Sequence, residues 1–299
     1  MYFVFPENCR DLVFRTTRLF DGKRLINYVI LAAEVKDKQF CAALCFMENN
    51  CFSYNTKTRV INGKLKCELN NATHEGHEND LLDDPDYFYC AAEMIPVYCH
   101  MDNNGLGENR ECNGGGWTLV MKTDGTKMTF HYDSQLWSNN ESFNAHDGTT
   151  GFDTLETKLP TYWSTPFSKI CLGMKINTQL NFISIDRPSN SLHALVADGQ
   201  YRNITLDRDK WKKLVGSQAS LQHNCNKDGF NVFSTNFGLS RTRIGILGNN
   251  EDHCRSCDSR IGFGAGGGPD NSNTCGNEVR YGGDNGDKHL KTMGYILVQ

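Results

Sequence analysis

The chain has 299 residues, a formal net charge of −4 and 38% hydrophobic residues. This length is enough for two domains with modest cores. Because the charge balance is slightly acidic, the sequence lacks the basic excess with which proteins neutralise nucleic acid phosphates. We therefore expect no nucleic acid partner. The sequence also lacks an apolar run of about 18 residues, so we expect no transmembrane segment.

The 13 cysteines are the most informative feature of the composition. Such a density is typical of oxidising compartments, where disulfides stabilise loop-rich domains. Three Asn-x-Ser/Thr sequons, at Asn71, Asn140 and Asn203, agree with passage through a secretory pathway. Residues 1–6 lack the basic and long apolar regions of a complete signal peptide, which predicts a mature form or an incomplete precursor. The sequence thus predicts a secreted, disulfide-bonded glycoprotein.

Residues 37–47 have the apolar spacing of a short amphipathic helix. Asp37 can cap its first turn, and Cys41 and Cys45 lie one turn apart on the same face. Residues 51–54 begin an extended segment after a turn. We therefore expect a helix that is joined to a small sheet by two cysteines.

An acidic segment follows at residues 74–86, with six carboxylates and neither lysine nor arginine. A solvated surface loop is one interpretation of this charge bias. Weak contact with cations or with a mineral surface is the other, because hard cations favour carboxylate oxygens. Both interpretations stay open at the level of the sequence.

The cysteines of the first 90 residues follow a recognisable pattern, Cys-x3-Cys-x5-Cys-x-Ser-Tyr from Cys41, framed by earlier and later cysteines. Together with the helix, this order resembles the PAN/apple family over residues 8–92. The resemblance implies a small domain of one sheet and one helix. It also implies three disulfides, Cys9–Cys90, Cys41–Cys67 and Cys45–Cys51. PAN/apple domains generally bind proteins or carbohydrates, but the cysteine pattern transfers no binding residue.

In the remainder of the chain, three consecutive glycines precede an apolar segment, residues 117–122, whose Trp117 we expect to anchor a core. Residues 293–299 form a second apolar segment, which we expect inside a sheet. Between them the patterns predict strands at residues 170–176, 192–197 and 243–247, and a helix at residues 207–215 capped by Asp207. The predicted class is α+β with long glycine-rich loops.

The motif Val97-Tyr-Cys-His-Met101, followed by Gly-Gly-Gly-Trp117 and the terminal strand, resembles a fibrinogen-related domain over residues 95–299. The aspartate-rich calcium segment of vertebrate fibrinogen is absent, and residues 249–276 are similar instead to the intelectin branch. The order of the two domains is similar to that of cnidarian secreted matrix proteins, including coral skeletal organic matrix proteins.

Residues 249–287 combine many oxygen-bearing side chains with glycines. Calcium takes about six to eight oxygen ligands, and loops constrained by disulfides can supply them from separate turns. The resemblance to intelectins implies a calcium ion whose open positions bind sugar hydroxyls, with Asn250, Asp252, His253 and Asp270 as metal ligands and Tyr281 as an aromatic wall. A structural calcium site, no metal, or a protein-binding pocket are the alternatives.

Cys254 and Cys257 form a Cys-x-x-Cys motif. A thioredoxin-like redox site would need this motif at the start of a helix, and zinc would need two further ligands at suitable spacing, so disulfide bonding is the favoured interpretation. The expected pairs are Cys99–Cys112, Cys171–Cys225, and Cys275 with Cys254 or Cys257. The remaining cysteine predicts a disulfide-linked oligomer or a buried free thiol.

Motifs of serine hydrolases, zinc proteases and phosphate-binding loops are missing, so we expect no enzymatic activity. The sequence instead favours a secreted adhesion or matrix protein that binds an extracellular glycan or protein ligand with calcium. The alternative is a structural component of an organic matrix that contacts a mineral surface without sugar-specific binding.

Overall fold

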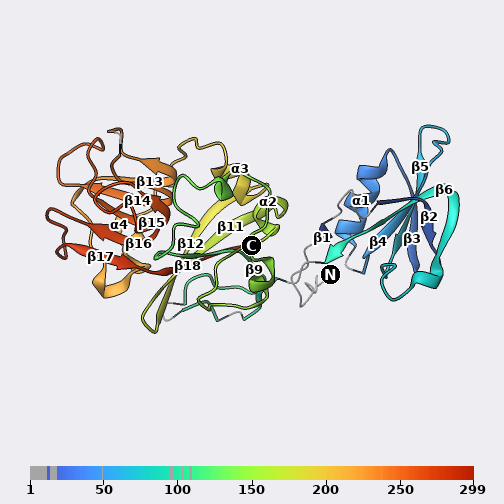
Figure 1. Cartoon of the computed structure of the whole chain (residues 1–299), viewed down its shortest axis with the longest axis horizontal. Coiled ribbons are helices and arrows are strands. Elements are labelled where there is room, and N and C mark those ends of the chain that lie inside the picture. The colour runs from blue at the N-terminus through green and yellow to red at the C-terminus, as the bar shows by residue number, and fades with distance from the viewer. Residues whose placement is uncertain are drawn as a thin grey trace. The chain divides into compact units, whose positions relative to one another are not determined.

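The computed structural model describes residues 12–13, 19–48, 50–94, 97–102, 104–107, 110–236 and 238–299. These residues fall into two compact units, one up to residue 94 and one from residue 97 (Figure 1). They form mostly β-strands with a few short helices, which is compatible with the predicted α+β class. In these ranges no helix has the length and apolar character needed to cross a membrane.

The N-terminal unit is built on an antiparallel sheet with the strand order β2-β6-β4-β5-β3. Its strands are β2 (Leu19–Leu25), β3 (Val29–Val35), β4 (Ser53–Lys57), β5 (Leu65–Asn70) and β6 (Leu81–Ala91). The other elements are the short pair β1 (Leu12–Val13) and β7 (Glu93–Met94), a 3-10 turn η2 (Glu78–Asp80) and one helix, α1 (Lys38–Met47). The helix packs against β4 and β5.

The predicted helix at residues 37–47 is confirmed as α1. The Asp37 side chain accepts a hydrogen bond from the Phe40 backbone N–H at 2.9 Å and so caps the first turn. Cys41 and Cys45 are the buried residues of this helix. They form the Cys41–Cys67 and Cys45–Cys51 disulfides, which are two of the three pairs implied by the resemblance to the PAN/apple family.

The third implied pair of this unit, Cys9–Cys90, is wrong. Cys90 is a free and buried thiol, and Cys9 lies outside the described residues. Cys90 faces Tyr54 across the β4–β6 ladder and packs with it in the core of the unit. Burial raises the pKa of this thiol, as expected for a group that is enclosed by apolar side chains.

The first sheet of the C-terminal unit has the strand order β10-β9-β18-β11-β12, with β8 paired to β9. Its strands are β8 (Cys99–His100), β9 (Trp117–Asp124), β10 (Thr157–Lys158), β11 (Phe167–Ile176), β12 (Gln179–Ser189) and β18 (Met293–Val298). The final strand lies between β9 and β11, which confirms the prediction that this apolar segment lies inside a sheet. Trp117 is buried, which confirms its predicted role in a core.

The second sheet of this unit contains five antiparallel strands in chain order. They are β13 (Asn224–Phe233), β14 (Arg241–Asn249), β15 (Ser259–Gly266), β16 (Cys275–Val279) and β17 (Lys288–Lys291). The main core joins side chains of both sheets, such as Leu172 and Ile261, with Trp211. The helical elements around it are η3 (Gln135–Trp137), η4 (Ala145–Thr149), α2 (Thr161–Ser164), α3 (Leu192–Val196), α4 (Arg208–Lys213) and η5 (Gly216–Gln218).

Two of the three predicted internal strands are confirmed, because residues 170–176 lie in β11 and residues 243–247 lie in β14. The strand predicted at residues 192–197 is wrong, since this segment forms α3. The Ser191 side chain accepts a hydrogen bond from the Ala194 backbone N–H, and the buried side chains have helical spacing. The helix predicted at residues 207–215 is present as the shorter α4, capped by Asp207.

The predicted disulfides of the C-terminal unit are wrong. The structure contains Cys112–Cys171 and Cys225–Cys254 instead of Cys99–Cys112 and Cys171–Cys225. Cys171 lies in the first sheet and Cys225 in the second, which places them in different parts of the unit. Cys99 is in another disulfide, whereas Cys257 and Cys275 are free and buried, so the Cys257–Cys275 pair is also absent. Cys275 faces the core beside Gly294 and Phe263.

Candidate metal centre

Three of the four predicted metal ligands, Asn250, Asp252 and His253, lie in the turn between β14 and β15. His253 is engaged locally, because its backbone carbonyl accepts a hydrogen bond from Asn249 Nδ2 at 2.6 Å and its ring Nδ1 lies 3.3 Å from the same nitrogen. The Asp252 side chain is exposed. The fourth predicted ligand, Asp270, belongs to a different cluster.

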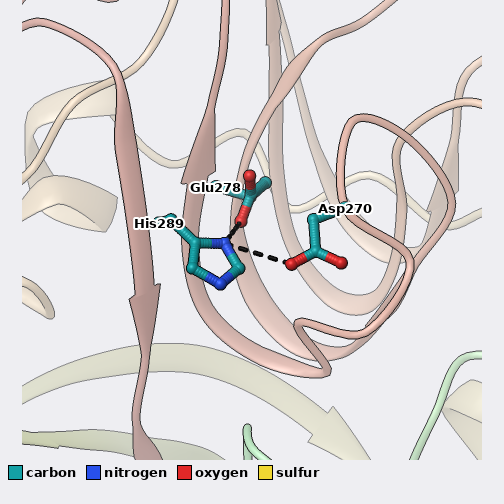
Figure 2. A group of neighbouring side chains, drawn as sticks. All are labelled: Asp270, Glu278 and His289. Carbon is teal, nitrogen blue, oxygen red and sulfur yellow. Dashed lines mark hydrogen bonds and ion pairs between the residues drawn. The ribbon is translucent and has the colours of Figure 1, made fainter.

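Asp270 converges with Glu278 and His289, as Figure 2 shows. His289 Nδ1 lies 2.6 Å from Glu278 Oε2 and 3.1 Å from Asp270 Oδ2. The ligand atoms of the three side chains all lie within 4.8 Å of one another. Across the described ranges, this is the one set of three histidine, cysteine or acidic side chains with such spacing.

Two members of the cluster are brought together by strand register. Glu278 in β16 is directly opposite His289 in β17, and opposite residues of an antiparallel pair project from the same face. Because β17 is the edge strand of its sheet, the His289 side chain is 53% exposed, whereas that of Glu278 is only 2% exposed. The pair therefore has a buried carboxylate and a solvent-accessible imidazole.

Arg260 positions the third member. Its buried guanidinium donates to the backbone carbonyl oxygens of Gly268 and Asp270, at 2.8 Å for Gly268, and also to those of Gly267 and Asn273. Burial lowers the pKa of Arg260 to about 10, although the carboxylates of Glu278 and Asp270 oppose this effect. The guanidinium therefore stays charged at neutral pH and holds the loop that carries Asp270.

The Asp270 carboxylate is ionised and oriented by its own loop. Its Oδ1 accepts hydrogen bonds from the Ser272 backbone N–H at 2.7 Å and from Ser272 Oγ at 2.8 Å. Partial burial would raise the pKa of Asp270, but these hydrogen bonds and the electrostatic effect of the neighbouring His289 and Lys291 side chains outweigh it, and the pKa lies below its ordinary value. The other oxygen, Oδ2, is the one directed at His289.

The donor set fits a divalent cation. Two carboxylates suit calcium, whereas an imidazole nitrogen beside two carboxylates suits zinc. Asn273 Nδ2 donates to Glu278 Oε2 at 3.1 Å, and the Oδ1 of the same amide is buried without a hydrogen-bond partner, which leaves an unsatisfied oxygen close to the cluster. A hollow of about 330 Å³ is lined by the three residues together with Val279, Arg280, Asp287 and Lys288.

Sequence reasoning missed Glu278 and His289. The signal that could have found them is the glycine-rich segment 280–287, because a turn centred there forms a hairpin that pairs these two residues. Tyr281, the predicted aromatic wall, is 66% exposed in this turn and is not among the residues that line the hollow.

Comparisons of the chain with models of protein families, with curated proteins and with solved structures found no match. The resemblances to the PAN/apple and fibrinogen-related families therefore stay predictions from the sequence.

Proposed function

We propose that this protein is a secreted, non-enzymatic adhesion or matrix protein that binds an extracellular glycan or protein ligand through a cation held at Asp270, Glu278 and His289. The convergence of these three side chains beside an open hollow is the observation that carries the proposal. The disulfides of both units fit an oxidising compartment. The three sequons, Asn71, Asn140 and Asn203, are exposed, as glycan attachment requires.

A cation bound here would have room for a ligand. Three protein side chains supply fewer donors than the six to eight oxygens that calcium takes. Water or the hydroxyl and carboxylate oxygens of a ligand would complete the shell. His289 is half-exposed on an edge strand, so a large extracellular ligand could reach the cation from solvent. Calcium is the ion that we propose from the sequence, and zinc is the competitor that the histidine introduces.

A glycan and matrix-protein array, read with added calcium, with added zinc and with a chelator, tests the proposal. We expect retention that requires one of the two cations and is lost on chelation. Asp270→Asn should abolish retention, because it removes a ligand charge while keeping the size of the side chain. Asp252→Asn, in the exposed turn after β14, is the matched control and should bind normally.

Cation-independent retention on mineral or matrix, without any effect of Asp270→Asn, would contradict the proposal and favour the structural matrix role. The acidic segment at residues 74–86, which the structural alternative would use for mineral contact, is not a free acidic loop. Part of it forms η2 and β6, and its charges are partly paired, as in the contact of Asp83 with Lys23 at 2.6 Å.

A further inference from the structure

Three sulfur atoms lie together at the turn between β14 and β15. Cys225 is bonded to Cys254, and the free thiol of Cys257 lies 3.7 Å from Cys225 Sγ. The three cysteines pack in one small cluster with Val232 and Leu247. A thiol at van der Waals distance from a disulfide sulfur is placed for thiol–disulfide exchange.

The backbone around these cysteines is irregular, so a change of disulfide partner here would not have to break a regular strand ladder. Cys225 lies where the β13–β14 register shifts between Asn224 and Lys227, and its φ of 67° is in the left-handed region. Cys254 and Cys257 lie in a turn rather than in a strand. A change of partner at Cys225 therefore requires movement of a turn and a bulge, while the paired strands stay in place.

We propose that Cys257 displaces Cys254 from Cys225, so that this turn exists as two disulfide isomers, and that the released Cys254 forms mixed disulfides by exchange with low-molecular-weight disulfides. The thiolate of Cys257 attacks Cys225 Sγ. The Cys225–Cys257 bond forms as the Cys225–Cys254 bond breaks, and the electron pair leaves on Cys254 Sγ, which takes up the proton that Cys257 lost. The exchange needs no external oxidant.

The exchange moves the free thiol from the interior to the surface. Cys257 is fully buried, whereas Cys254 is half-buried between the exposed residues His253 and Arg255. The released Cys254 thiolate can then attack a low-molecular-weight disulfide such as oxidised glutathione. That step forms a mixed disulfide on Cys254 and releases one molecule of the reduced thiol.

The buried thiol limits the rate of the first step. Burial raises the pKa of Cys257, with Asp258 acting in the same direction and Lys227 against it. The thiolate is therefore a minor species at neutral pH, and exchange is slow. Incubation at about pH 8 for hours gives the reaction time to reach equilibrium.

The sequence allows the two isomers to be separated by mass spectrometry. Trypsin cleaves after Arg255, so it places Cys254 in peptide 244–255 and Cys257 in peptide 256–260, while Cys225 lies in peptide 214–227. After incubation, free thiols are trapped with N-ethylmaleimide at about pH 6, before digestion, to stop further exchange. We expect peptide 214–227 linked to peptide 256–260 in a fraction of the molecules, with the maleimide on Cys254. Its complete absence would overturn the proposal.

Oxidised glutathione is the probe for the second step. We expect a glutathione adduct on Cys254 in the wild-type protein, and loss of this adduct in Cys257→Ser, because Cys254 then stays bonded to Cys225. Cys275→Ser removes a buried thiol from the main core and is the matched control, which should keep the adduct. An adduct of equal yield in Cys257→Ser, or none in the wild type, would contradict the proposal. The wild-type peptide map decides the first step even if a variant fails to fold.

Discussion

The two units use their cysteines in different ways. In the N-terminal unit, cysteines are five of the nine buried residues of the main core cluster, where they pack with Tyr54 and Leu69. In the C-terminal unit, the main cluster is aliphatic and aromatic, Cys275 is its one cysteine, and the disulfides lie outside it. A small unit cannot bury enough apolar surface to be stable by packing alone, so it relies on crosslinks, whereas a larger unit relies on packing.

The largest effect should come from a core residue of the C-terminal unit. Trp211→Ala removes a fully buried indole and should cost about 4 kcal/mol of the free energy of unfolding. Hydrogen exchange resolved by peptide should show the loss in residues 97–299 alone. Tyr281→Ala removes an exposed ring and should change stability by less than about 0.5 kcal/mol. Equal losses in the two variants would contradict a packing-based C-terminal unit.

The next effect concerns the crosslinks of the N-terminal unit. Cys41–Cys67 spans 26 residues and Cys45–Cys51 spans 6. By the loop-entropy model, double replacement with alanine should cost about 3.5 kcal/mol for the long loop and about 2 kcal/mol for the short one. Denaturant unfolding with hydrogen exchange in residues 19–94 measures both. If neither replacement lowers the stability of the N-terminal unit, the claim that this unit depends on its crosslinks is wrong.

An ion-pair cluster should give a smaller, pH-dependent effect. The Asp284 carboxylate contacts Arg208 and Lys212 of α4 at 2.7 Å each and accepts the Leu221 backbone N–H. Although partial burial would raise the pKa of Asp284, these hydrogen bonds hold it well below its usual range. Asp284→Asn should therefore cost about 2 kcal/mol at neutral pH.

The sign of the pH dependence follows from the lowered pKa of Asp284. The stabilisation is fully present above the unfolded-state pKa of about 4 and is lost as pH falls toward the folded-state value. The stability gap between Asp284→Asn and the wild type should thus shrink below about pH 4. Asp252→Asn, at an exposed aspartate, should show no such gap. If the stability difference between Asp284→Asn and the wild type widened on acidification, the stabilising role of the ionised Asp284 carboxylate would be refuted.

The sequence predicted local features well and long-range ones poorly. The helix at residues 37–47 and the strand at residues 170–176 follow from periodicity, which depends on neighbours in the chain. The segment 192–197 was misassigned because a short apolar run fits a strand or a buried helix equally. The disulfides of the C-terminal unit could not be derived, since their partners are set by the packing of separate strands.

The candidate metal centre shows the same limit. Asp270 entered the predicted ligand set through the resemblance to intelectins, together with Asn250, Asp252 and His253, which the structure places in a separate turn. Glu278 and His289 depend on the register of the β16–β17 hairpin, and the placement of Asp270 beside them depends on the contacts of Arg260 with the 267–273 loop. These relations appear only when the second sheet is assembled.

Calorimetric titration of the intact protein with calcium and with zinc tests the proposed centre most directly. We predict saturable binding of one cation, weakened by about tenfold or more in Asp270→Asn and unchanged in Asp252→Asn. Absence of binding to either ion, or binding that Asp252→Asn abolishes and Asp270→Asn preserves, would contradict the assignment of the cation to Asp270, Glu278 and His289.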